Sequence, residues 1–192
     1  MLAFTGAPEE LIRVVDPRYA DDARADFTAY VVTTLQHNPR VGGRFNPPGE
    51  FGALYMTSDE ATAWAELHAR FLREGVPGLP SRMGVLRVLL RAGRFVDLTD
   101  ANACAAWGVL PATLVANHPP DEEREACWRV ARDIRSVADF LRAPSARAAG
   151  SNVPLFVRGR RDSEWVFELI AADAARVTPE SLRQVSTESW DD

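Results

Sequence analysis

The segment from residue 36 to residue 52, QHNPRVGGRFNPPGEFG, restricts the folding of this chain more than any other part of it. Glycine, proline and asparagine are so frequent in this segment that neither a helix nor a strand can run through it. We therefore expect a long ordered loop or a series of turns. Polar loops of this kind carry binding chemistry more often than they carry packing.

Regular structure is expected to resume directly after this loop. Residues 53–56 (ALYM) have the composition of a short strand, and residues 57–60 (TSDE) have the S/T-x-x-E pattern of a capping box. Apolar residues then recur at three- and four-residue spacing up to Gly75. The pattern predicts an amphipathic helix of about four turns that ends at this glycine.

Strands and helices are expected to follow one another irregularly along the rest of the chain. Because no regular βαβ rhythm is present, an α+β domain is favoured over a doubly wound sheet. The chain has 192 residues and neither an internal repeat nor a linker, so we expect a single domain over residues 1–192. Strands are predicted at 85–90, 94–98, 138–142, 153–157 and 165–170, and helices at 122–135 and from a cap at Thr99 and Asp100 toward Trp107.

Composition and charge narrow the classes of function. The net charge of -5 disfavours nucleic acid or an anionic membrane as the main partner, because both require a basic surface. The chain has no apolar run of the roughly 18 residues that a membrane span needs, and its first residues lack the order of a signal peptide. Cys104 and Cys127 form no metal-ligand pattern, so no metal site is predicted. The expected location is the cytoplasm.

Common catalytic signatures do not occur in the sequence. It has no G-x-G-x-x-G, G-x-x-x-x-G-K-S/T, H-E-x-x-H or G-x-S-x-G motif. The three histidines, His37, His68 and His118, stand in unrelated contexts, and His68 is expected at the core or its rim. No histidine is assigned to catalysis.

Arg44 is the first candidate for ligand binding. The two glycines before it would let the backbone approach a ligand closely, and the prolines after it would stiffen the loop. A guanidinium group offers a rigid fork of donors for phosphate oxygens, which makes a diphosphate a reasonable ligand. The alternative is an arginine on a solvated turn.

Tyr55 and Glu66 are the next two candidates. Tyr55 ends the predicted strand, where its ring could stack on a flat heteroaromatic group or pack into the core. Glu66 lies on the helix face opposite Trp64 and Phe71, where it could form a surface ion pair with Arg70. It would line a cleft instead if the preceding loop folded over that face.

Ser145 follows the predicted strand at 138–142. The sequence places no histidine to activate it, so a nucleophilic serine is not indicated. Its hydroxyl would either hydrogen-bond a ligand or belong to a turn or cap.

Taken in order, four short runs resemble the RES domain family, which is named for its Arg, Glu and Ser. They are GGRFNP at 42–47, LY at 54–55, AE at 65–66 and PSAR at 144–147. The resemblance covers about residues 11–157 and leaves a C-terminal strand and tail at 158–192. It implies a fold similar to that of ADP-ribosyltransferases, with mixed or antiparallel sheets around an NAD cleft and flanking helices. Phe45 replaces the tryptophan common in this loop, and residues 18–40 are more numerous than in compact members.

The resemblance also implies an activity and partners. Family members are typically toxins of bacterial toxin–antitoxin pairs, and the paired antitoxin is an Xre-like protein that also binds DNA. They degrade NAD by phosphorolysis or hydrolysis of the nicotinamide–ribose bond. NAD would thus be a substrate and phosphate a co-substrate, with no cofactor. The chain itself would bind neither nucleic acid nor a membrane, and it would form a homo-oligomer or a toxin–antitoxin hetero-oligomer.

The resemblance further implies roles for individual residues. Arg44 would hold the diphosphate, and Tyr55 would stack near the nicotinamide. Glu66 would bind the ribose and stabilise its cation-like transition state. Among upstream arginines Arg13 is the better match, while Arg18 stays an alternative. The implied catalytic residues are Glu66, Arg44 and Ser145, and the implied substrate-binding residues are Arg13, Arg44, Asn46, Tyr55 and Ser145.

Two other functions stay open at this level. The same NAD contacts would serve an ADP-ribosyltransferase that modifies a protein. A non-catalytic ligand-sensing or interaction domain would keep the fold, although it would not need Arg44, Tyr55, Glu66 and Ser145 together.

Overall fold

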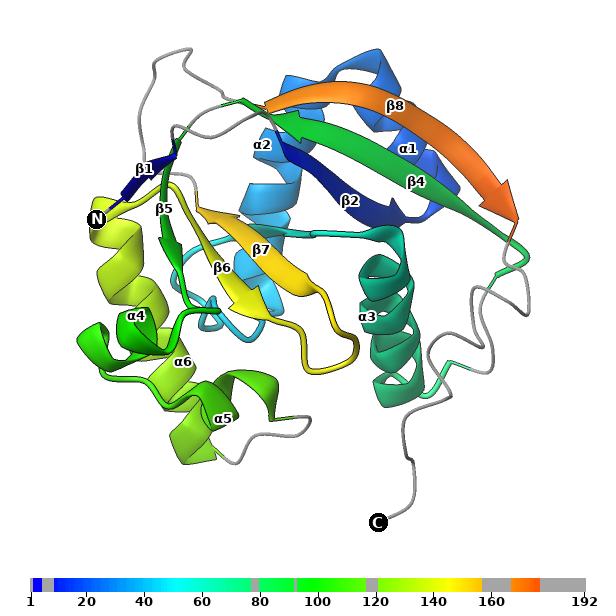
Figure 1. Ribbon diagram of the computed structural model, residues 1–192. Coiled ribbons are helices and arrows are strands. Elements are labelled where there is room, and N and C mark those ends of the chain that lie inside the picture. Colours follow the sequence, from blue (N-terminus) through cyan, green and yellow to red (C-terminus); the bar gives the residue numbers. More distant parts are fainter. Residues whose placement is uncertain are drawn as a thin grey trace.

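A computed structural model describes residues 2–4, 9–76, 80–91, 93–116, 121–156 and 167–176. Its centre is an eight-stranded sheet in the order β1-β5-β6-β7-β3-β2-β4-β8, with helices packed around it (Figure 1). Strands β5 and β6 pair in parallel, and the other neighbours are antiparallel. The mixed sheet confirms the predicted α+β class.

The elements follow the chain in this order: β1 Leu2–Phe4, β2 Glu9–Val15, α1 Pro17–Ala25, α2 Phe27–His37, the short 3₁₀ helix η1 Asn38–Arg40, β3 Ala53–Thr57, α3 Glu60–Arg73, β4 Arg82–Leu90, β5 Gly93–Asp97, α4 Ala101–Ala106, α5 Pro111–Val115, α6 Asp121–Val137, β6 Phe140–Pro144, β7 Ser151–Phe156 and β8 Phe167–Arg176.

The two faces of the sheet are covered by different helices. On β2, Leu11 and Val15 belong to a buried cluster with residues of α1 and α2. Ile12 and Val14 alternate with them and belong to a cluster with Trp64 of α3. Since successive side chains of a strand point to opposite faces, α1 and α2 cover one face and α3 covers the other. Helices α4, α5 and α6 gather beside β5 and β6 (Figure 1).

Helix α3 has a clear start signal and a clear stop signal, but its N-cap residue differs from the prediction. The N-cap is Asp59, whose side chain accepts a hydrogen bond from the amide of Thr62 at 2.8 Å. The predicted capping box was wrong, because the helix is capped two residues after Thr57, whose hydroxyl lies 3.1 Å from the carbonyl of Ile12 and 2.8 Å from that of Asp59. The predicted end is confirmed: Gly75 follows the C-cap with φ of 67°, a left-handed conformation that favours glycine.

Most of the other predicted elements are confirmed with shifted ends. The strand expected from 138 begins at Phe140, because helix α6 runs on to Val137. The predicted cap at Asp100 starts α4, and its side chain accepts from the amide of Asn102. Residues 157, 165 and 166 of two predicted strands lie outside the described residues. The sequence analysis did not predict β1, β2, α1, α2 or α5.

The loop at 36–52 is held in place by α6, although its first two residues still belong to α2. Trp128 Nε1 donates to the carbonyl of Gly43 at 2.8 Å, and Arg132 binds both carboxylate oxygens of Glu50 at 2.9 and 2.7 Å. Phe45 is fully buried in the core between the loop and α6. These contacts confirm an ordered loop and explain how it keeps a fixed position against the sheet.

Candidate functional site

Glu66 lies at the centre of a polar cluster on α3. Its Oε1 atom accepts hydrogen bonds from Ser145 Oγ at 2.7 Å and from Asn152 Nδ2 at 2.7 Å. Its Oε2 atom accepts none from the part of the chain that the structure describes. The predicted alternative, an ion pair with Arg70, was wrong, because Arg70 binds Glu74 at 2.8 Å. Glu66 therefore presents one fixed and one open carboxylate oxygen.

Ser145 reaches Glu66 because the turn between β6 and β7 is docked on the start of α3. The amide of Ser58 donates to the carbonyl of Ser151 at 3.0 Å, and Ser58 Oγ accepts from the amide of Ser151 at 2.9 Å. Gly150 approaches the cap so closely that a Cβ atom there would lie 2.0 Å from Asp59 Oδ2. The same turn is closed by a hydrogen bond from the amide of Ser145 to the carbonyl of Gly150, at 2.9 Å.

Tyr55 connects the glycine–proline loop to the sheet through its hydroxyl. The hydroxyl donates to Asn46 Oδ1 at 2.8 Å and accepts from the amide of Phe45 at 2.8 Å. Burial raises the pKa of Tyr55 well above its usual value, although the amide of Phe45 and the charge of Arg44 act against this. The phenol is therefore neutral and serves as an anchor of the loop.

Asn46 was predicted to bind substrate directly, and in the structure it lies within the loop, so a direct contact with substrate stays a prediction. Its side chain is fully buried, with an exposed fraction of 0%. It accepts the hydroxyl of Tyr55 and donates Nδ2 to the carbonyl of Phe51 at 3.2 Å. A buried amide that is hydrogen-bonded within the loop helps to hold the loop in its conformation. Gly43 is required beside it, because a Cβ atom would lie 2.7 Å from both Asn46 Oδ1 and Tyr55 Oη.

The guanidinium group of Arg44 is hydrogen-bonded to backbone carbonyls at the end of α5. One terminal nitrogen donates to the carbonyl of Leu114, and the other donates to the carbonyl of Ala116 at 2.7 Å. A guanidinium group carries five N–H donors, so these two contacts leave further donors for a ligand. The alternative of an arginine on a solvated turn does not fit these contacts.

Electrostatic effects show that Arg44 and Glu66 lie near the same groups. Both charges act on Tyr55. Burial lowers the pKa of Arg147, the Glu66 carboxylate opposes this change, and the charges of Arg44 and Arg73 reinforce it. The loop arginine and the helix carboxylate thus act on the same two side chains, Tyr55 and Arg147, and their convergence on one ligand stays a prediction. Charges of both signs that act on one side chain, Arg147, would suit a ligand that has an anionic part and a cationic part.

The two upstream arginines lie elsewhere. Strands β2 and β3 pair only between Ile12 and Thr57. Arg13 reaches from β2 to β3 and donates to the carbonyl of Tyr55 at 2.6 Å and to the hydroxyl of Tyr30 at 3.0 Å. Its side chain thus lies on the α2 side of the sheet, while Glu66 lies on the α3 side. Arg18 is exposed and pairs with Asp16 at 3.0 Å. A role of Arg13 in ligand binding stays a prediction.

Three residues of this cluster were not predicted from the sequence. Asn152 is a buried polar residue in the otherwise apolar run NVPLF, which is a signal for function. Arg73 is seven positions after Glu66 and so lies on the same helix face. Arg147 stands in the PSAR run, but no role was given to it.

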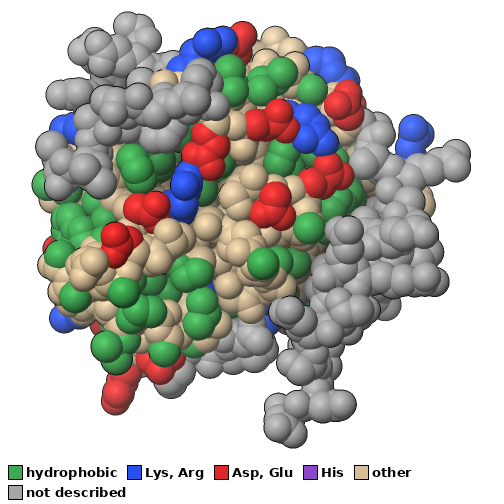
Figure 2. Space-filling view, viewed as in Figure 1, with side chains coloured by type: hydrophobic (Ala, Val, Ile, Leu, Met, Phe, Trp, Pro, Cys, Tyr) green, Lys and Arg blue, Asp and Glu red, His purple; other side chains and the backbone are tan. Residues whose placement is uncertain are grey.

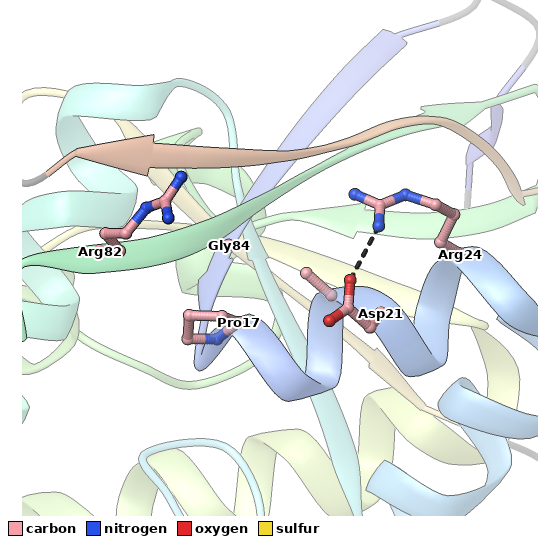
Figure 3. A pocket seen from close by; sticks show the side chains of 6 residues that line it. Pro17, Asp21, Arg24, Arg82 and Gly84 are labelled. Carbon is pink, nitrogen blue, oxygen red and sulfur yellow. Dashed lines mark hydrogen bonds and ion pairs between the residues drawn. The ribbon is translucent and has the colours of Figure 1, made fainter.

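A cavity of about 230 Å³ lies at a different place, between α1 and β4. Figure 3 shows Arg24 and Arg82 reaching toward it from opposite sides, above Gly84. Arg24 is already engaged by Asp21, at 2.8 Å, and by the carbonyl of Ala172. No residue that lines this cavity belongs to the cluster around Glu66.

Several general features of the described residues bear on function. Among them, no group of three or more His, Cys, Asp or Glu side chains could hold a metal ion. No helix within the described ranges is long and apolar enough to span a membrane. Figure 2 shows acidic and basic side chains interspersed over one face of the molecule. The described residues that are visible on that face form no continuous basic surface of the kind that nucleic acid requires.

This chain is similar to known proteins both in sequence and in fold. The chain is 32% identical over 123 residues to the probable NAD(+) phosphorylase Rv3189 of Mycobacterium tuberculosis, covering 64% of this chain and 57% of that protein. The chain thus spans little more than half the length of this relative. A chain of the crystal structure of the M. tuberculosis MbcT–MbcA toxin–antitoxin complex superposes with a TM-score of 0.67 at 16% identity, over 93% of this chain and 88% of that chain. The RES domain model matches residues 10–173, and the chain therefore belongs to the RES domain family.

Proposed function

We propose that this protein degrades NAD by breaking the bond between nicotinamide and ribose. The observation that carries the proposal is the geometry of Glu66, which has Oε1 fixed by Ser145 and Asn152, while Oε2 accepts no hydrogen bond from the described residues. A carboxylate held in this way stabilises a positive charge that develops next to it. Cleavage of a nicotinamide riboside produces such a charge on the sugar.

The reaction balances without a cofactor. The C–N bond to nicotinamide breaks, and its electron pair leaves with the ring nitrogen, which was cationic and becomes neutral. The sugar carbon then carries the positive charge, beside Glu66. An oxygen of water or phosphate forms the new bond to this carbon, and with water a proton passes to solvent. The product is ADP-ribose or its 1-phosphate, so phosphate is proposed as a co-substrate and NAD as a substrate.

The arginines supply the complementary half of the site. Arg44, Arg73 and Arg147 give the cluster an excess of positive charge, which matches the diphosphate of NAD. Binding energy from the diphosphate then orients the reacting sugar against Glu66. The ring of Tyr55 is proposed to lie near the nicotinamide, because its hydroxyl is already used to anchor the loop.

A biological role follows from the relatives. Rv3189 is named a probable NAD(+) phosphorylase, and the superposed chain comes from a toxin–antitoxin complex. We accordingly assign this protein the role of a toxin that acts in the bacterial cytoplasm and is neutralised by a cognate antitoxin of Xre-like type. A toxin–antitoxin hetero-oligomer is the assembly that this role implies.

Product analysis tests the proposal. The purified protein is incubated with NAD, with and without phosphate, and the products are identified by mass. We expect free nicotinamide together with ADP-ribose, or with ADP-ribose 1-phosphate when phosphate is present, and about 100- to 1,000-fold slower product formation by the Glu66→Gln variant. Intact NAD after prolonged incubation would overturn the proposal, and ADP-ribose found attached to protein would favour the protein-modifying alternative.

A further inference from the structure

Asn152 has a polar side chain that is buried in the sheet. Packing of the fold alone does not explain why a polar residue occupies this position. It has an exposed fraction of 8%, and the rest of β7 after it, Val153 to Phe156, is buried and lacks polar side chains. A buried amide is unfavourable unless it is hydrogen-bonded. Its Nδ2 atom donates to Glu66 Oε1 at 2.7 Å, so it meets this requirement at the carboxylate of the site.

The backbone of Asn152 is held on both sides. It pairs with Thr57 of β3 and with Ala143 of β6, and both neighbours are strands of the sheet interior. Tyr55 pairs with Pro154, two positions along β7, so Tyr55 and Asn152 point to the same face as diagonal neighbours. The amide of Asn152 thus extends from a rigid part of the sheet, whereas Ser145 extends from the turn after β6.

Two donors from different elements restrict a carboxylate more than one donor does. The terminal torsion of a glutamate is broad, so a single hydrogen bond leaves the group free to rotate about that bond. With Ser145 and Asn152 both bound to Oε1, rotation would break at least one hydrogen bond. Oε2 is therefore kept in one direction.

We infer that Asn152 is a positioning residue for the reaction, which acts by fixing Glu66 so that Oε2 faces the sugar of the substrate. This inference rests on the proposed NAD-degrading function. The positioning role requires a side chain at position 152 that donates a hydrogen bond, and a side chain of the same size without a donor would not serve. Substrate binding depends mainly on the arginines, so loss of the donor should affect turnover more than the KM for NAD.

The first test compares Asn152→Ala with Ser151→Ala, a matched variant of the preceding residue. The side chain of Ser151 makes no hydrogen bond to the residues that the structure describes. For Asn152→Ala we expect kcat to fall by about 10- to 100-fold, as misplacement of a reacting group does, with KM changed less than about threefold. Ser151→Ala should keep the parental kcat. A kcat of Asn152→Ala within twofold of the parent would overturn the inference.

The second test uses Asn152→Asp, which keeps the size and shape of the side chain. A protonated carboxyl donates to Glu66, and an ionised one cannot. The ratio of the kcat of Asn152→Asp to that of the parent should therefore fall as the pH rises from about 5 to 9. A ratio that is constant over this range would mean that only packing matters, and the inference would fail. Thermal unfolding of each variant shows whether it is folded.

Failure of the inference is distinguishable from failure of the proposed function. If the parent protein does not consume NAD, the proposed function is wrong and the inference falls with it. If the parent is active, Glu66→Gln has lost most of its turnover and Asn152→Ala is fully active, only the role of Asn152 is wrong.

Discussion

Ser145 and Glu66 are 79 positions apart in the chain, and Ser145 Oγ donates a 2.7 Å hydrogen bond to Glu66 Oε1. This contact joins the turn after β6 to helix α3, two elements that also meet through Ser58 and Ser151. Because a docked turn moves less than a free one, Ser145 can hold the carboxylate in a fixed orientation. The start of α3 and this turn therefore act as one structural unit.

The first prediction concerns the charge of Glu66. Glu66→Gln keeps the size of the side chain and an oxygen that can accept from Ser145 and Asn152, but it removes the negative charge. Loss of a main electrostatic group lowers turnover by about two to three orders of magnitude. Nicotinamide release measures this, and Glu74→Gln, on the same helix but paired with Arg70, is the control. Parental turnover in Glu66→Gln would show that the carboxylate does not act on the reaction.

The second prediction concerns Arg44, which has a structural and a binding role. Arg44→Ala removes two hydrogen bonds to carbonyls at the end of α5, and it also removes a positive charge near Glu66. We expect the KM for NAD to rise about tenfold or more, with a smaller change in kcat, because a diphosphate contact acts on binding.

Arg44→Lys separates these two roles. It keeps the charge but not the fork of donors, so its thermal stability should fall with that of Arg44→Ala while its KM rises less. Steady-state kinetics and thermal unfolding measure both effects. An unchanged KM in Arg44→Ala would contradict a role in phosphate binding.

The third prediction concerns the pH dependence of the α3 cap. Burial raises the pKa of Asp59, but the amide of Thr62 and the hydroxyls of Ser58 and Thr62 lower it more, so the net pKa lies below its ordinary value of 3.8. A carboxyl with a lowered pKa stabilises the fold above its unfolded pKa, and this contribution is lost as the pH falls through the folded pKa.

Asp59→Ala should thus lower the free energy of unfolding by about 1 kcal/mol at pH 7, as loss of an N-cap usually does. The difference from the parent should stay constant down to about pH 4 and then shrink as the pH falls further. Urea unfolding at several pH values measures it. A difference that grows in acid would contradict the lowered pKa of Asp59.

The sequence predicted the elements that have a simple local signal. The periodic apolar residues and Gly75 gave α3, and the Gly/Pro-rich loop was recognised because no regular element can pass through it. Helices α1 and α2 were missed, although Asp16 and Pro17 form a standard helix start. The capping box was assigned to Thr57 because its pattern matched, but Thr57 still belongs to β3 and the helix is capped by Asp59.

The site was predicted only in part, because its contacts join distant parts of the chain. Motifs identified Arg44, Tyr55, Glu66 and Ser145, and the structure joins two of them, Ser145 and Glu66, by a hydrogen bond. Local spacing could not show that Glu66 binds Asn152, 86 positions away, in place of its helix neighbour Arg70. Pairing of this kind is set by the order of the strands.

The fourth prediction concerns the close approach of Gly150 to the start of α3. In Gly150→Ala the new Cβ would lie 2.0 Å from Asp59 Oδ2 and 2.2 Å from Thr62 Oγ1, so the turn must move away. Overpacking of this kind costs about 1 to 3 kcal/mol. Because Ser145 belongs to the same turn, NAD consumption should fall together with the thermal midpoint. Ala149→Ser, at an exposed neighbouring position, should change neither; parental stability of Gly150→Ala would contradict the tight docking of the turn.

The fifth prediction concerns Cys127, whose reactivity measures how often α6 and the glycine–proline loop separate. Cys127 and Cys104 are both buried and free. Burial raises the pKa of Cys127 to about 11, while the charge of Arg44 acts in the opposite direction. Since the thiolate is the reactive form, neither cysteine of the native protein should react quickly with a disulfide reagent at pH 8, and both should react after denaturation.

The slow reaction of the native protein should be limited by opening of α6 away from the loop, because Cys127 lies in the core that these two elements share. A variant that keeps only one cysteine, Cys104→Ser, assigns the signal to Cys127. Saturating NAD should slow its reaction, since a ligand held by Arg44 stabilises the closed arrangement. The reaction is followed by absorbance of the released reagent. Rapid labelling of native Cys104→Ser would show that this core is open to solvent, and it would contradict the fixed position of the loop on which the site depends.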